Sequence, residues 1–200
     1  MKNRMSCVNN SVMDDTKKKI IDPPRIWVRK LATLLFAADL DGDGITSSEY
    51  VMTIADRIVK SANLHGEASD NVIQIFREFA IGYEIVNDNI WKKTWWEHTL
   101  KYWSAIRNPE VVKEVQAFYT KLFQALDFNS DGFISISEYM HWWKALGLDP
   151  SLARLQFAYM DTDHDEKITE REFVDAALDY EHNYADGDTK NRFFGPLVDF

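Results

Sequence analysis

The stretch Asp127-Phe-Asn-Ser-Asp-Gly-Phe-Ile-Ser-Ile-Ser-Glu138 carries oxygen-bearing side chains at alternate positions and closes on a glutamate. A similar stretch runs from Asp161 to Glu172, and a shorter one begins at Asp39. A single acidic triplet is usually a surface turn, because Asp and Gly are ordinary turn residues. Here each of the three triplets is followed by an isoleucine and then a glutamate. This repetition indicates a recurring cation-binding loop.

The first of these stretches matches every position of the twelve-residue EF-hand calcium loop. Calcium prefers six to eight oxygen ligands, which such a loop supplies from positions 1, 3, 5, 7, 9 and 12. Gly132 at position 6 permits the left-handed turn, and Ile134 stands at the position that pairs with a second loop. The predicted ligands of this loop, called the hand 3 loop, are Asp127, Asn129, Asp131, the Phe133 carbonyl, Ser135 and the bidentate Glu138.

The stretch 161–172, called the hand 4 loop, departs from the pattern at one position. Glu166 stands where glycine is expected, and a left-handed conformation costs a non-glycine residue roughly 1–2 kcal/mol. Binding in the micromolar to nanomolar range releases about 8–12 kcal/mol, so we expect a weakened but functional site. Its predicted ligands are Asp161, Asp163, Asp165, the Lys167 carbonyl, Thr169 and Glu172, with Ile168 as the pairing residue.

The triplet at Asp39 opens a loop that is one residue short. Positions 39 to 49 span eleven residues, and such a loss rotates the following helix by about 100° unless the loop tightens. Either Gly44 or Ile45 then supplies the carbonyl ligand. For this hand 1 loop we expect calcium binding through Asp39, Asp41, Asp43, the Ile45 carbonyl and a bidentate Glu49.

Apolar residues recur every three to four positions between these loops, which predicts eight helices and an all-α fold of four helix–loop–helix units. EF-hands pair, so a second, degenerate hand is expected between hands 1 and 3. Its positions 1 and 12 would be Tyr83 and Thr94, with Ile90 as the pairing residue. Neither terminal residue is a carboxylate, so this loop should hold no metal.

The expected organisation has four parts. Residues 1–24 are polar and end in Pro23-Pro24, which predicts a mobile extension. Residues 25–108 and 109–185 each hold one pair of hands. Residues 186–200 form a tail.

Composition excludes several classes of function. The chain has 200 residues and a net charge of −9, which argues against nucleic acid or anionic lipid as the main partner. No apolar run is long enough for a membrane helix, and Lys2 excludes N-myristoylation as a membrane anchor. No signal peptide or internal disulfide is expected. The pattern therefore predicts a cytoplasmic monomer.

No arrangement of nucleophile, base or phosphate-binding loop suggests catalysis, so we expect no enzyme activity. The tryptophans fall at helical spacings that favour core packing over lining a ligand cavity, and the five histidines show no metal-binding spacing. The tryptophans in question are Trp95, Trp96, Trp103, Trp142 and Trp143.

The tail from Asp186 to Val198, the Leu146–Asp149 linker and the degenerate second hand resemble invertebrate sarcoplasmic calcium-binding proteins. This family is related to luciferin-binding proteins and calexcitin. The resemblance covers residues 26–200. It implies two packed lobes and a cytosolic buffer of Ca²⁺, with Mg²⁺ as an alternative occupant. It also implies that the apolar tail docks on the core through Phe193, Phe194, Leu197 and Val198.

Two other functions stay open at this stage. The wider superfamily contains luciferin-binding proteins and calcium-triggered photoproteins, whose cavity holds a small apolar ligand. A calcium sensor would instead expose a groove, often rich in methionine, to a protein target. Three of the six methionines (Met1, Met5 and Met13) lie in the N-terminal extension, which leaves few for such a groove.

Overall fold

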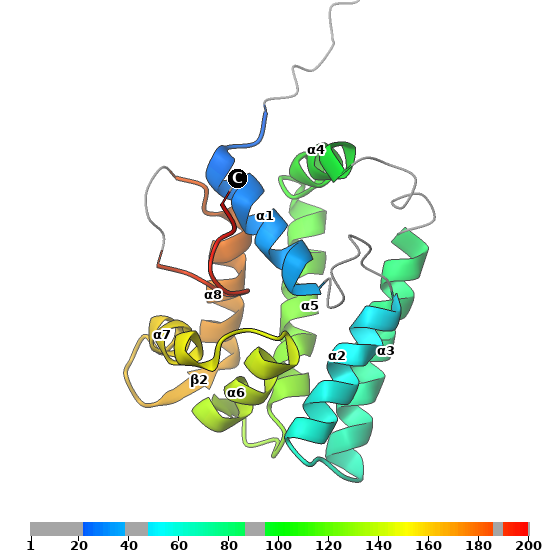
Figure 1. Cartoon of the computed structure of the whole chain (residues 1–200), viewed down its shortest axis with the longest axis vertical. Helices are drawn as coiled ribbons and strands as arrows, with labels where there is room; N and C mark the ends of the chain where they lie inside the picture. Colours follow the sequence, from blue (N-terminus) through cyan, green and yellow to red (C-terminus); the bar gives the residue numbers. More distant parts are fainter. Residues whose placement is uncertain (1–21, 39–47, 87–94, 186–189, 200) are drawn as a thin grey trace, which may run out of the picture.

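Figure 1 shows the computed structural model, which describes residues 22–38, 48–86, 95–185 and 190–199. This part of the chain is helical apart from two short strands, which confirms the predicted all-α fold with eight helices. The helices are α1 (Arg25–Ala38), α2 (Ser48–Ser61), α3 (Glu67–Val86), α4 (Trp95–Ala105), α5 (Pro109–Leu126), α6 (Ile136–Ala145), α7 (Pro150–Met160) and α8 (Glu170–His182).

The two strands join the hand 3 and hand 4 loops. β1 (Phe133–Ser135) pairs antiparallel with β2 (Lys167–Thr169), and Ile134 lies opposite Ile168. Both isoleucines are fully buried. The predicted pairing of the two loops is therefore confirmed. It fixes the two candidate metal sites side by side, at the starts of α6 and α8.

Local signals in the sequence explain where the helices of this half begin and end. Asn108 and Asp149 cap α5 and α7, each followed by a proline at the first helical position. α6 ends just before a glycine. Leu146 is the cap, and Gly147 follows it at φ +70°, a conformation that favours glycine.

The larger apolar core is shared by both halves of the chain. It joins residues of α2 and α3 to residues of α5 through α8 and to the tail. α2 and α3 lie antiparallel at one side of the molecule, and α5 passes through its middle (Figure 1). A smaller cluster joins α1 to α4 through Trp27, Val28, Leu31, Trp103 and Ile106.

The tryptophan predictions are mostly confirmed. Trp103, Trp142 and Trp143 are buried as expected. Trp96 is 44% exposed, so the prediction of core packing was wrong for this residue. It precedes Trp103 by seven positions and lies in the first turn of α4. The side chain of Trp95 lies outside the described residues.

The structure places the predicted start of the second loop inside a helix. α3 continues to Val86, so Tyr83 is part of a helix and does not open a loop. Ile90 and Thr94 lie outside the described residues. The prediction that this hand holds no metal stays a prediction.

The C-terminal tail packs into the molecule as the resemblance implied. Phe193 and Phe194 are buried, Leu197 packs against the larger core, and Val198 is partly buried. The Val198 backbone bonds to α1 in both directions: its N–H donates to Thr33 and its carbonyl accepts from Arg29. The tail thus ties α1 to α8, the two helices that cross in Figure 1.

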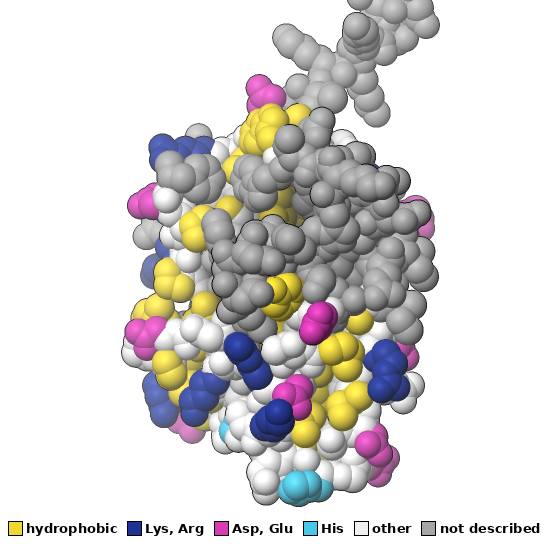
Figure 2. Space-filling model, turned by 45° about the vertical axis from the view of Figure 1, so that its right-hand side comes forward, with side chains coloured by type: hydrophobic (Ala, Val, Ile, Leu, Met, Phe, Trp, Pro, Cys, Tyr) yellow, Lys and Arg dark blue, Asp and Glu magenta, His cyan; other side chains and the backbone are white. Residues whose placement is uncertain are grey.

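The surface mixes charge types. On the face in Figure 2, acidic, basic and apolar side chains alternate over the lower part of the molecule. Within the described ranges, no helix combines the length and apolar character that a membrane crossing needs.

Candidate metal centre

The hand 3 loop is folded around its first aspartate. Asp127, at the end of α5, accepts hydrogen bonds from the backbone N–H of Asp131 (3.1 Å) and of Gly132 (2.9 Å). Asn129 accepts a further bond from the Asp131 N–H at 3.0 Å. These bonds turn the side chains at positions 1, 3 and 5 toward the same side of the backbone. Asp127 is buried and the other two are exposed.

The hand 4 loop repeats this arrangement. Asp161 accepts from the N–H of Asp165 (3.1 Å) and of Glu166 (3.1 Å). One carboxylate oxygen from each of Asp161, Asp163 and Asp165 lies within 4.8 Å of the others, close enough to share a cation. Three negative charges at this separation repel one another unless a cation neutralises them.

The closing glutamate of each loop is held by a capping box. In hand 3, the Ser135 hydroxyl accepts from the Glu138 N–H, while Glu138 accepts from the Ser135 N–H at 2.8 Å. Thr169 and Glu172 repeat this exchange in hand 4. The box starts the exit helix and also turns the glutamate back toward the loop.

The Glu172 carboxylate is kept ionised by its surroundings. Burial acts to raise its pKa, but hydrogen bonds from Thr169 and Thr162 outweigh burial and lower the pKa to about 2. Hydrogen bonds to a carboxylate favour its charged form, which is the form that binds a cation.

Both loops contain left-handed residues at the same two positions. Ser130 and His164 at position 4 have φ of +56° and +61°, and Gly132 and Glu166 at position 6 have φ of +87° and +65°. The prediction that Glu166 is forced into left-handed geometry is therefore confirmed. The hand 4 loop keeps the shape of the hand 3 loop despite lacking the glycine.

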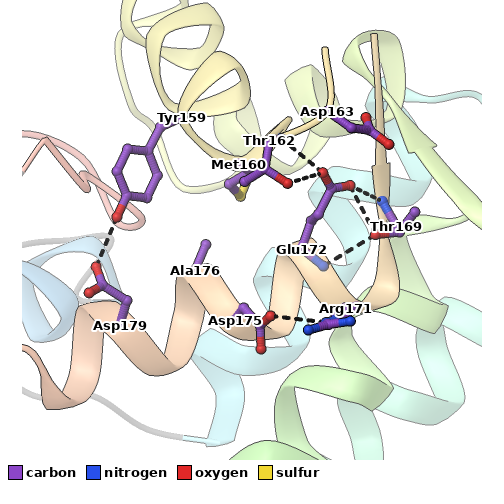
Figure 3. Close-up of a pocket in the computed structure, with 10 residues that line it drawn as sticks. All are labelled: Tyr159, Met160, Thr162, Asp163, Thr169, Arg171, Glu172, Asp175, Ala176 and Asp179. Atoms are coloured by element: carbon purple, nitrogen blue, oxygen red, sulfur yellow. Dashed lines mark hydrogen bonds and ion pairs between the residues drawn. The ribbon is translucent and has the colours of Figure 1, made fainter. Parts of the chain in front are cut away.

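A cleft opens beside the hand 4 loop, between α7 and α8 (Figure 3). Its volume is about 490 Å³. Thr162, Asp163, Thr169 and Glu172 line the end near the loop, and Tyr159 and Asp179 lie at the other end. Solvent therefore reaches the glutamate of hand 4 from this side.

The structure describes one predicted ligand of the hand 1 loop, Glu49. Asp39, Asp41, Asp43 and Ile45 lie outside the described residues. Glu49 lies in the first turn of α2 with an exposed side chain.

Sequence reasoning missed one residue at the hand 4 site. Thr162, at position 2 of the loop, donates to Glu172 through its backbone N–H at 2.8 Å and its hydroxyl at 2.7 Å. Position 2 is not a ligand position, so the motif gives no reason to examine it. The available signal was a hydroxyl where hand 3 has Phe128.

The residues of hands 3 and 4 suit a hard divalent cation. They supply carboxylate, amide, hydroxyl and carbonyl oxygens, which calcium and magnesium both prefer. Loop amides hold the first aspartate and capping boxes hold the last glutamate, so these metal-binding oxygens are restrained before an ion arrives. The assignment of individual ligands stays a prediction.

Comparison with known proteins agrees with this chemistry. Residues 116–178 match the EF-hand domain pair family. The sarcoplasmic calcium-binding protein of Hediste diversicolor is 30% identical over 178 residues, covering 86% of this chain and 99% of that protein. The luciferin-binding protein of Renilla reniformis is 24% identical over 181 residues, covering 86% of this chain and 94% of that protein.

A solved structure shares the fold. The calcium-loaded apo form of the coelenterazine-binding protein from Renilla muelleri superimposes with a TM-score of 0.71 at 23% identity, covering 86% of this chain and 96% of that one. These relatives are named for binding and not for an enzyme activity, in agreement with the expectation from the sequence. The chain belongs to the sarcoplasmic calcium-binding protein family and is a calcium-binding EF-hand protein.

Proposed function

We propose that the protein is a cytoplasmic calcium buffer that acts as a monomer and accepts magnesium in the same loops. The hand 3 and hand 4 loops each hold one ion through the ligands predicted above. Beyond these two ions, the hand 1 loop offers a third site through Asp39, Asp41, Asp43, Ile45 and Glu49.

The observation that carries this proposal is the position of Phe193. A calcium sensor works by opening an apolar groove between its helices for a target. Here the Phe193 ring packs against Tyr119 of α5 and Phe173 of α8, at centroid distances of 5.6 and 5.1 Å. The chain's own tail therefore occupies the apolar surface that a target helix would need, which favours a buffer over a sensor.

Polar contacts hold the tail in this position. Asn191 is fully buried and donates to the Ala176 carbonyl (2.7 Å) and to Asp179 (2.9 Å) on α8. It also accepts from Gln156 of α7 at 3.1 Å. Releasing the tail would leave these buried polar groups unpaired, which is costly.

Two measurements test the buffer proposal together. Titration calorimetry should show two or three calcium sites whose apparent affinity falls when magnesium is present. An apolar-surface dye should show little change in fluorescence between chelator and saturating calcium. A large calcium-dependent rise in dye fluorescence would favour the sensor, and fewer than two calcium sites would contradict the buffer.

A luciferin carrier is the second candidate, and one buried cluster favours it. Glu181 of α8 accepts from the hydroxyls of Tyr119 (2.7 Å) and Tyr102 (3.0 Å) in the interior. Such a cluster offers hydrogen bonds to the few polar atoms of a buried, largely apolar ligand, and a luciferin-binding relative exists. Titration with coelenterazine decides the question: saturable quenching of tryptophan fluorescence would support the carrier, and its absence would oppose it.

A further inference from the structure

The closing glutamates of hands 3 and 4 differ in how their carboxylate oxygens are occupied. Oε2 accepts the same pair in both hands, an N–H and a hydroxyl from position 9. These come from Ser135 at 2.8 and 2.7 Å and from Thr169 at 3.0 and 2.9 Å. The difference lies at Oε1.

Position 2 of each loop supplies the donors to Oε1. In hand 3, the Phe128 N–H donates to Oε1 of Glu138 at 3.0 Å. Among the described residues, no other group donates to this oxygen. In hand 4, Thr162 donates both its N–H (2.8 Å) and its hydroxyl (2.7 Å) to Glu172 (Figure 3).

A carboxylate has about four lone-pair sites, two on each oxygen. Four donors therefore occupy all the sites of Glu172, and three donors leave one site of Glu138 open on Oε1. A bidentate calcium ligand must give the ion a lone pair from each oxygen. Oε2 carries two donors in both hands, so each glutamate must release one donor there before it binds the ion through both oxygens. At Oε1, Glu138 can bind the ion without losing a hydrogen bond, but Glu172 must also release the Thr162 hydroxyl.

We propose that Thr162 is a positioning residue that restrains calcium binding in hand 4 by competing with the ion for Oε1 of Glu172. The competitor is a charge-assisted hydrogen bond, which is stronger than a neutral one. The Thr162 side chain is exposed and lines the solvent-open cleft, so its hydroxyl turns to water when the ion arrives. Thr162 thereby holds the affinity of hand 4 below the level that its four carboxylates would give.

This inference rests on the proposed function, because it requires that hand 4 binds calcium through Glu172. Its test uses Thr162→Val, which keeps the shape and the backbone N–H and removes the hydroxyl. Thr162→Ser is the matched control, because it restores a hydroxyl at the same position. Glu172→Gln shows separately whether hand 4 binds at all.

The readout is the backbone amide resonance at position 6 of each loop, followed by NMR in chelator-buffered calcium. The Glu166 and Gly132 amides both donate to the first aspartate of their own loop, so each reports on its own site. Hydrogen bonds to charged groups are worth on the order of tenfold in an equilibrium constant. We expect Thr162→Val to lower the calcium midpoint of Glu166 about tenfold relative to that of Gly132. Thr162→Ser should match the unmodified chain.

The failures are distinguishable. If Thr162→Val leaves the Glu166 midpoint unchanged or raises it, Thr162 does not compete with the ion, and this inference is overturned while the buffer proposal stands. If Glu172→Gln has no effect on the Glu166 resonance in calcium, hand 4 does not bind through Glu172, and both ideas fail for this loop.

Discussion

Trp27 donates its indole N–H to the backbone carbonyl of Glu181 at 3.0 Å, joining two residues 154 positions apart. Trp27 lies on α1, which enters hand 1, and Glu181 lies on α8, which leaves hand 4. Two more contacts reinforce this junction: Lys30 donates to the Asn183 carbonyl, and Tyr180 donates to the Lys30 carbonyl. The first and last hands are therefore fastened directly to each other.

Replacing Trp27 by phenylalanine should destabilise the protein. The change removes a buried hydrogen bond and leaves a cavity between α1 and α4, which together should cost about 1–3 kcal/mol. Urea unfolding measures this loss. Trp96→Phe is the matched control at an exposed position, and it should change the free energy of unfolding by less than about 0.5 kcal/mol. Equal losses in both variants would argue against the junction.

Glu181 should make the folded state less stable as pH rises. Burial raises its pKa above the ordinary value of 4.5, although hydrogen bonds from Tyr119 and Tyr102 act in the opposite direction. A raised pKa means that the unfolded chain ionises first, so the stability contributed by the protonated group is lost as pH rises from 4.5 through the folded pKa.

Glu181→Gln tests this linkage because glutamine cannot ionise. Unfolding is measured in chelator at several pH values above 4.5, and the stability of the variant relative to the unmodified chain should increase with pH. The limiting slope is about 1.4 kcal/mol per pH unit. Glu110→Gln, which removes an exposed carboxylate, is the matched control. A flat difference for Glu181→Gln would mean that this carboxyl does not titrate abnormally.

The loops were predictable from the sequence because a metal loop is a local device. Asp, Gly and Glu at fixed spacing determine the backbone, and Ile134 and Ile168 pair because they occupy equivalent positions. The contacts between distant elements were not predictable in this way. Nothing near Glu181 in the sequence shows that Tyr119 and Trp27 will surround it, because those contacts come from how α1, α5 and α8 pack. Thr162 was missed because its role depends on a side chain ten positions later.

The left-handed residues at position 6 give a pair of opposite predictions. Gly132→Ala should destabilise hand 3 by about 1–2 kcal/mol through backbone strain alone, since an added Cβ meets no atom within 4 Å. Glu166→Gly should stabilise hand 4 by up to about 1 kcal/mol, because it relieves the same strain but adds freedom to the unfolded chain. Thermal unfolding in chelator measures both changes. Changes of the same sign would show that φ at this position does not control loop stability.

Removing the Phe193 ring should release the tail. The side chain is fully buried, and truncating such a phenylalanine to alanine costs about 3–5 kcal/mol. The variant should also bind an apolar-surface dye, because the surface beneath the ring becomes accessible. Leu155→Ala removes a side chain that is 70% exposed and should do neither. A stable Phe193→Ala protein that binds no dye would remove the main support for the buffer over the sensor.

The central claim is that the hand 3 and hand 4 loops each bind one calcium ion through their closing glutamates. Calorimetric titration of the unmodified chain, Glu138→Gln, Glu172→Gln and the double variant tests it most directly, with circular dichroism to confirm that each remains helical. We predict that each single variant loses one calcium ion per chain and that the double variant loses two. An unchanged stoichiometry in both folded single variants would contradict the claim.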